Sequence, residues 1–161
     1  MILKDALMPH EKFMKEALKE ARKAAKKNEV PVGCVIVNDG KIIGRGHNII
    51  RSKNDACGHA EIVAIRKACV KLKNERLIGS TLYVNIEPCP MCAGAILLAR
   101  VKTLVYGAND IKTGACGSVF SVINDPRNNH QVGLVKGVLV TECGGIVSDF
   151  FRSKRLEKRA N

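Results

Sequence analysis

Two short motifs constrain the fold of this chain more than any other feature of its sequence. His59 and Glu61 form the first motif, and Cys89 and Cys92, within Pro-Cys-Pro-Met-Cys, form the second. One imidazole and two thiolates are ligand types that zinc prefers, and three protein ligands leave the fourth tetrahedral position open for water, as in catalytic zinc sites. Glu61 is not needed as a ligand and could move protons to and from that water. The fold must therefore bring both motifs to one point.

Local backbone patterns indicate how the two motifs could meet. Residues 88–99 read as a helix start that runs into an apolar stretch, and the three-residue spacing puts both cysteines on one helix face. The positive end of a helix lowers the pKa of a thiol and favours the thiolate that binds metal. His59 would lie at the start of a helix over residues 60–70, where the backbone is not yet regular. We therefore expect two helix N-termini to converge on one metal.

The cysteines allow two other interpretations. A C-x-x-C pair alone could be a redox dithiol, which leaves His59 and Glu61 without a role. A structural zinc would need a fourth protein ligand, yet the remaining cysteines are single: Cys34, Cys57, Cys69, Cys116 and Cys143. A fourth protein ligand would also displace the water, so His47 and His130 are interpreted as non-ligands. The two motifs together favour a catalytic zinc.

Length and composition are typical of one ordinary domain. With 161 residues, of which 46% are hydrophobic, the chain can bury a full core, and we expect a single domain over residues 1–161. The sequence has no apolar run long enough to predict a membrane span. Lys4 and Asp5 interrupt the N-terminus before any signal-peptide core. Seven cysteines without an export signal predict free thiols in a reducing cytoplasm.

The charge balance predicts an anionic partner. The 27 Lys and Arg residues outnumber the 15 Asp and Glu residues, for a formal net charge of +12, which favours binding to a polyanion such as nucleic acid. Basic residues gather in 12–27, where they could simply form the solvated face of a helix, and again after Phe151. The second group adjoins Phe150 and Phe151, and an aromatic beside basic groups is typical of sites for single-stranded nucleic acid.

Hydrophobic periodicity predicts an α/β fold. Helices are expected at 9–28, 60–70, 88–99 and 142–159, and strands at 30–37, 41–47, 82–86, 103–107 and 135–141. This order implies a three-layer α/β/α sandwich around a mixed five-stranded sheet. Ligands in such sheets bind outside the carboxyl ends of strands, where the loops to both metal helices would lie. The Gly-rich stretch 112–121 lacks the terminal lysine of a phosphate-binding loop.

On these residues the chain resembles the cytidine-deaminase-like superfamily. Its zinc-dependent base deaminases carry H-x-E followed by P-C-x-x-C, with the glutamate as general acid and base. Over its whole length the chain is similar to the bacterial tRNA-specific adenosine deaminase family within that superfamily. The segments that carry this closer resemblance are 28–33, the loop at Asn48, 110–114, Asn129-His130 and 148–152.

The resemblance implies hydrolytic deamination of adenosine to inosine at the wobble position of a tRNA anticodon loop, by a homodimer with one Zn²⁺ per subunit. It makes His59, Cys89 and Cys92 the metal ligands and Glu61 the catalytic proton shuttle. The implied substrate-binding residues are Val30, Asn48, Ala60, Asp110, Lys112, Asn129, Phe151 and Arg152. An apolar pocket around Val30 and Ile86 would keep Glu61 poorly solvated and therefore easier to protonate.

Two positions depart from the family pattern, and several contacts have plainer interpretations. Gly58 stands where a small residue such as alanine is usual, and this could loosen the helix start. Asn109 stands where arginine is frequent, and the arginine's contact with the anticodon loop would then be missing. Asn48 could merely satisfy its own loop backbone, and Asp110 with Lys112 could be a solvated surface pair. Asn129 could belong to its turn and Phe151 to helix packing.

Three rival functions remain open at this stage. A guanine or cytosine deaminase would share the metal motif, whereas a non-catalytic, zinc-stabilised RNA-binding module would not need Glu61. A variant engineered to act on single-stranded DNA would present the same sequence features. The basic balance and Phe150-Phe151-Arg152 favour RNA over a small molecule.

Overall fold

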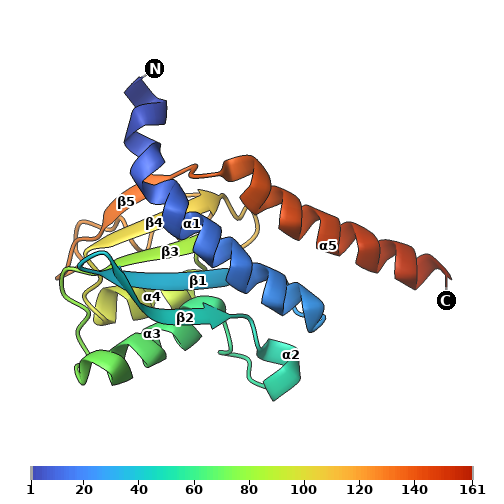
Figure 1. Cartoon of the computed structure of the whole chain (residues 1–161), viewed down its shortest axis with the longest axis horizontal. Helices are drawn as coiled ribbons and strands as arrows, with labels where there is room; N and C mark the ends of the chain where they lie inside the picture. Colours follow the sequence, from blue (N-terminus) through green and yellow to red (C-terminus); the bar gives the residue numbers. More distant parts are fainter. Residues whose placement is uncertain (1, 161) are drawn as a thin grey trace.

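A mixed five-stranded sheet forms the centre of the molecule (Figure 1). The computed structural model describes residues 2–160, with side chains described for residues 9–160. In spatial order the strands are β2 (Lys41–His47), β1 (Gly33–Asn38), β3 (Thr81–Ile86), β4 (Thr103–Ala108) and β5 (Gly133–Lys136). Strand β1 is antiparallel to both of its neighbours, and β3, β4 and β5 are parallel. The carboxyl ends of β2, β3, β4 and β5 therefore lie at the same end of the sheet.

Helices cover both faces of this sheet (Figure 1). They are α1 (Ile2–Lys26), α2 (Ile50–Lys53), α3 (Ala60–Leu72), α4 (Pro90–Leu98) and α5 (Val140–Ala160). Side chains alternate along β1, so that Cys34 and Ile36 pack toward α3 and α4 while Val35 and Val37 pack toward α1. Both faces of the sheet are thus buried in hydrophobic core. The predicted three-layer sandwich with a mixed five-stranded sheet is confirmed.

Close packing of α3 on β2 fixes the start of α3. A Cβ on Gly46 would collide with the backbone of Ala60 and Ala64, so glycine lets the helix lie directly on the strand. Because α3 begins at Ala60, this contact also sets the place of His59, the residue that precedes the helix.

Several predicted element boundaries were wrong. Strand β5 ends at Lys136 instead of 141, because the chain turns at 137–139, where Leu139 has a φ of 50°. Strand β1 begins at Gly33 instead of 30, because residues 30–32 make a tight local turn in which Val32 N donates to Val30 O at 2.7 Å. The short helix α2, inside the expected loop 48–58, was not predicted.

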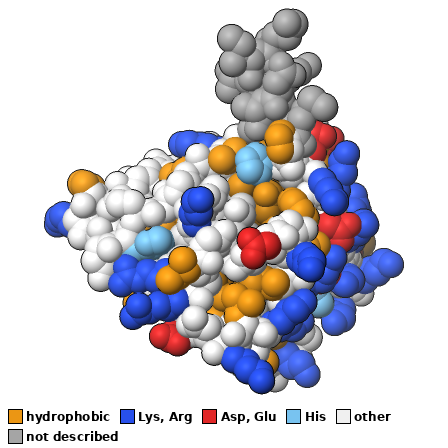
Figure 2. All heavy atoms as spheres, turned by 60° about the vertical axis from the view of Figure 1, so that its left-hand side comes forward, with side chains coloured by type: hydrophobic (Ala, Val, Ile, Leu, Met, Phe, Trp, Pro, Cys, Tyr) orange, Lys and Arg blue, Asp and Glu red, His pale blue; other side chains and the backbone are white. Residues whose placement is uncertain are grey.

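The surface carries the charge excess of the sequence. Figure 2 shows one face on which Lys and Arg side chains are numerous and Asp and Glu side chains are few. In the part of the chain that the structure describes, no helix has the length and apolar character needed to span a bilayer.

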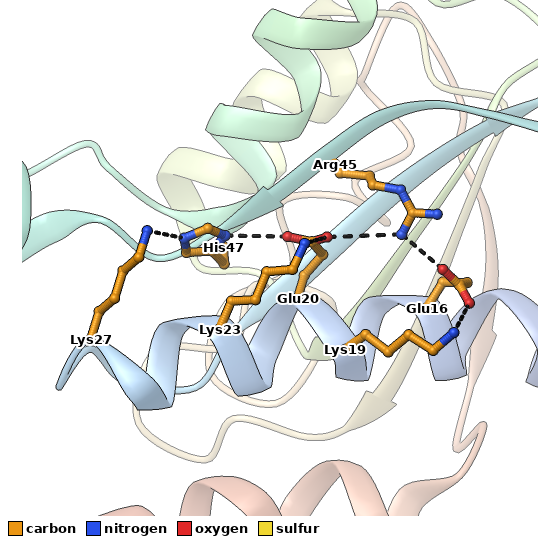
Figure 3. Close-up of polar contacts among 7 residues, drawn as sticks. All are labelled: Glu16, Lys19, Glu20, Lys23, Lys27, Arg45 and His47. Atoms are coloured by element: carbon orange, nitrogen blue, oxygen red, sulfur yellow. Dashed lines mark hydrogen bonds and ion pairs between the residues drawn. The ribbon is translucent and has the colours of Figure 1, made fainter.

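A polar network ties α1 to β2 (Figure 3). Glu20 on α1 is buried, and its carboxylate lies 2.7 Å from Lys23 Nζ and 3.2 Å from His47 Nδ1. Arg45 on β2 reaches the Glu16 carboxylate at 2.8 Å. His47 thus has its partner on α1, as expected for a histidine that is not a metal ligand.

Candidate active site

The structure places His59, Cys89 and Cys92 in one cluster, with ligand atoms within 4.8 Å of one another. Nδ1 of His59 lies 3.6 Å from the Cys89 sulfur and 3.5 Å from the Cys92 sulfur. His59 is the N-cap of α3, and Cys89 is the N-cap of α4, with Pro90 in its first turn. Two helix N-termini converge on this point, as the sequence predicts. Their positive ends favour thiolate at the cluster.

The pKa values of Cys89, Cys92 and His59 depend on one another. A hydrogen bond from Cys92, together with His59, lowers the pKa of Cys89 to about 4. The same contact with Cys89, burial and the nearby Glu61 raise the pKa of Cys92. The hydrogen bond to Cys89 raises the pKa of His59. Two thiolates side by side repel each other, and a shared cation between them would relieve that repulsion.

Glu61 lies beside this cluster in the first turn of α3. Its side chain is 3% exposed, and its Oε2 atom has no hydrogen-bond partner among the residues that the structure describes. Burial raises the pKa of its carboxyl group. A buried carboxylate with an unpartnered oxygen is costly, and such groups occur where an acid or base is needed for chemistry.

These residues fit zinc by two observations. One imidazole nitrogen and two sulfurs, preorganised within ligand range, are the donor set typical of zinc and are unsuited to magnesium or calcium. The unpartnered oxygen of Glu61 lies next to the donors without being needed among them. This arrangement can hold a metal and can move a proton close to it.

A cavity of about 210 Å³ opens onto the cluster. Its walls come from several segments between residues 30 and 113: Val30, Val32, Asn48, Ile50, His59, Glu61, Ile86, Glu87, Cys89, Asp110 and Thr113. Oδ1 of Asn48 accepts a hydrogen bond from Ala60 N at 3.0 Å, which ties the loop after β2 to the start of α3. Asn48 therefore bonds another element and not only its own loop. Val30 and Ile86 give this cavity apolar walls beside Glu61, as expected.

A second, outer cavity of about 420 Å³ shares walls with the first. Asp110, Lys112 and Phe151 line it, the last from α5. Oδ1 of Asp110 accepts hydrogen bonds from the backbone N–H groups of Lys112 and Thr113. Burial alone would raise the pKa of Asp110, but bonds from the Thr113 hydroxyl and these N–H groups outweigh burial and lower it. Asp110 thus organises a turn at the cavity wall, which a solvated surface pair with Lys112 would not do.

Three of the predicted contact residues do not line either cavity. Ala60 is buried at the start of α3 and takes part through its backbone N–H. Arg152, on α5 next to Phe151, is paired with Asp149. Asn129 lies before the amino end of β5, at the end of the sheet opposite the loops that carry the cluster. Arg100 Nη1 donates to its backbone and side-chain oxygens there at 3.2 Å. In a single subunit Asn129 is therefore remote from the cluster.

The two departures from the family pattern have structural settings. Gly58 is buried, and a Cβ there would lie 3.0 Å from Asp55 O and from the Ile49 side chain, so glycine suits this loop. Asn109 is exposed and lines the outer cavity, the place where the more frequent arginine would add positive charge.

Sequence reasoning missed two buried polar residues that shape the site. Asn85 accepts from Gly33 N at 2.8 Å and donates to Pro31 O at 2.9 Å, which holds the segment with Val32 against the cavity. Glu87 accepts four hydrogen bonds from the 110–118 segment. The available signal was that both lie in or just after the otherwise apolar strand β3, where a polar side chain needs a partner.

Comparison with known families gives one clear match. Residues 8–155 match the model of the MafB19-like deaminase family. A tRNA-specific adenosine deaminase from Bacillus subtilis (strain 168) is 50% identical over 150 residues, which cover 93% of each chain.

Solved structures agree with this match. A structure from work on A-to-I editing by tRNA:A34 deaminases at the wobble position superposes with a TM-score of 0.80. It is 46% identical and covers 83% of this chain and 97% of its own. A guanine deaminase from Bacillus subtilis superposes with a TM-score of 0.62 at 35% identity and covers 91% of this chain and 93% of its own.

Proposed function

The chain belongs to the MafB19-like deaminase family and, within it, to the tRNA-specific adenosine deaminases, and on this premise we propose its reaction and substrate. It is a hydrolase that converts adenosine to inosine at the wobble position of a tRNA anticodon, with water consumed and ammonia released. The 50% identity to a tRNA-specific adenosine deaminase over nearly the whole chain carries this conclusion, because the guanine deaminase is less similar.

One zinc ion per subunit is the proposed cofactor, held by His59 Nδ1 and the sulfurs of Cys89 and Cys92. When bound, zinc supplies a Lewis acid that makes water ionise near neutral pH. The protein supplies ligands that are already gathered, with Cys92 buried and with His59 and Cys89 half-buried at the wall of the cavity.

Glu61 is the proposed catalytic acid and base. Its buried carboxyl group has a raised pKa, so it can both take and return a proton. In the proposed sequence Oε2 takes one proton from the attacking water and passes it to the purine ring nitrogen. It then takes the second proton from the hydroxyl group that has been added at C6 and passes it to the amine, which leaves as ammonia. The apolar walls Val30 and Ile86 exclude competing solvent from this carboxyl group.

The outer cavity and α5 are the proposed contacts for the anticodon loop. Phe151 is 43% exposed beside Lys112 and Asp110, so it offers an aromatic face next to a cation. The last turns of α5 are strongly basic, with Arg152, Lys154, Arg155, Lys158 and Arg159. Asn48 would contact the base held in the inner cavity. Asn129, which lies before the amino end of β5, stays a predicted contact to RNA outside this cavity.

A homodimer is proposed from the groove between α3 and α4. Ile62, Ile65, Ala95 and Leu98 line this groove, and Leu98 is 82% exposed. Apolar side chains presented by two adjacent helices are typical of a surface that another protein covers. We also propose a cytoplasmic location, where tRNA is found and where the five cysteines other than the proposed ligands Cys89 and Cys92 would stay reduced.

One assay tests the reaction against its nearest alternative. Purified protein loaded with zinc is given an anticodon stem-loop with adenosine at the wobble position, and inosine is measured. In parallel, ammonia release is measured from free guanine, cytosine and adenine. We expect inosine in the stem-loop and no release from free bases. Ammonia from guanine with an unreacted stem-loop would replace the proposal with guanine deamination.

A further inference from the structure

Glu87 joins β3 to the metal motif, and its carboxylate is buried with every acceptor position used. The side chain is 2% exposed. Oε1 accepts from Cys116 N at 2.8 Å and from Ser118 N at 3.2 Å. Oε2 accepts from Asp110 N at 3.1 Å and from the Ser118 hydroxyl. A carboxylate has about four acceptor positions, so this group has none left for a substrate or for an attacking water.

The segment that Glu87 binds has little regular structure of its own. Residues 109–123 form turns and one isolated bridge, between Cys116 and Ser121, in place of a helix or a strand of the sheet. The next residue after Glu87 adds one more bond, because Ala115 N donates to Pro88 O at 2.8 Å. Two consecutive residues thus hold this loop against the end of β3.

The loop held in this way forms a wall of the inner cavity. Asp110 and Thr113 line that cavity together with His59, Glu61 and Cys89. The backbone N–H of Asp110 is bound by Glu87, while its side chain organises the turn that contains Thr113. Because Glu87 lies two residues before Cys89, the position of this wall is tied to the position of the metal cluster.

Close packing makes the loop and the carboxylate depend on each other. A Cβ on Gly114 would collide with the Glu87 carboxyl group and with the Asp110 carbonyl oxygen. Any side chain at Gly114 would therefore have to displace the loop or the carboxylate.

We propose that Glu87 is a positioning residue that holds the 110–118 loop, and with it the substrate-facing turn at Asp110 and Thr113, in register with the metal cluster. Glu87 does this without contacting the reacting atoms. The kinetic part of the proposal rests on the proposed deaminase function, whereas the structural part concerns the loop alone.

The direct test is Glu87→Gln, which keeps the side-chain shape but puts an amide N–H group against backbone N–H donors. We expect kcat/KM for the anticodon stem-loop to fall roughly 10- to 100-fold, mainly through a higher KM, as for other residues that orient active-site groups. Zinc content should equal that of the wild-type protein. Amide hydrogen exchange should accelerate in residues 110–118. Glu11→Gln, at a glutamate on α1 whose side chain is 38% exposed and pairs with Lys15, is the matched control and should change nothing.

Gly114→Ala is the second variant and leaves Glu87 itself intact. It should raise KM and loop exchange in the same way, and it decides the question if Glu87→Gln does not fold. Wild-type KM and wild-type exchange across 110–118 would overturn the proposal. Loss of zinc from Glu87→Gln with the loop still protected would also overturn it, since Glu87 would then serve the cluster. If the wild-type protein leaves the stem-loop unreacted, the proposed function fails, but loop exchange still decides this inference.

Discussion

Glu61 and Glu87 are buried to nearly the same depth, at 3% and 2% exposure, yet their surroundings are opposite. Glu61 Oε2 has no hydrogen-bond partner among the described residues, whereas the Glu87 carboxylate accepts four hydrogen bonds. Both lie within two residues of a proposed metal ligand. Depth and proximity to the cluster therefore do not tell the two roles apart, but hydrogen-bond satisfaction does.

The difference shows how one residue type serves two purposes in one site. An unsatisfied buried carboxylate destabilises the folded protein, and that cost is tolerated where the group must exchange protons. A satisfied carboxylate can anchor irregular backbone, because its charge strengthens each N–H bond that it accepts. We expect substitutions at Glu61 to change chemistry and substitutions at Glu87 to change geometry and stability.

The largest expected effect comes from removing the metal. It should stop the chemistry in which Glu61 takes part and leave the loop that Glu87 holds unchanged. Cys92→Ala, or treatment with a chelator, should abolish deamination, because the cluster would lose a ligand or its cation. Hydrogen exchange in residues 110–118 should stay as in the untreated protein, since Glu87 and Pro88 hold that loop without a metal. Zinc is measured by metal analysis of the purified protein. Normal zinc in Cys92→Ala would contradict the ligand assignment.

Glu61→Gln should have the next largest effect. The amide cannot carry protons, so kcat should fall by about 10²- to 10⁴-fold, the range for a positioned acid or base. Zinc content should be unchanged. The free energy of unfolding should stay the same or rise, because a neutral amide is less costly to bury than an unpartnered carboxylate. Single-turnover rates and urea unfolding test this pair of expectations. Wild-type turnover by this variant would exclude Glu61 from the mechanism.

Glu87→Ala should reverse that pattern. Three backbone N–H groups, those of Asp110, Cys116 and Ser118, would lose their acceptor. The bond to Cys116 N is buried and the other two are partly buried. A buried donor left unsatisfied costs about 1–3 kcal/mol, so we expect a loss of stability of at least about that size. Urea unfolding of the zinc-loaded protein measures this loss. If Glu87→Ala is as stable as Glu61→Gln, the hydrogen bonds of Glu87 do not stabilise the loop, and the contrast between the two carboxylates fails.

The gathering of His59, Cys89 and Cys92 and the sheet could be predicted because their signals are local. The spacing of Cys89 and Cys92, and the apolar periods of the strands, depend only on neighbouring residues. The role of Glu87 could not be predicted in this way, because its partners lie 23 to 31 positions further along the chain. Asn129 illustrates the same limit. Its motif pointed to the substrate, but only the topology shows that it lies at the far end of the sheet.

Ser118→Ala should have the smallest effect, and it separates the parts of the Glu87 anchor. The substitution removes the hydroxyl donor and keeps the three backbone N–H donors. A hydrogen bond to a charged group is worth about 1.5–3 kcal/mol, but Ser118 is exposed, so water can take the place of its hydroxyl group and offset most of that loss. We therefore expect at most a small loss in urea stability, with KM and zinc content unchanged. A loss as large as that of Glu87→Ala would show that the hydroxyl, and not the backbone, carries the loop.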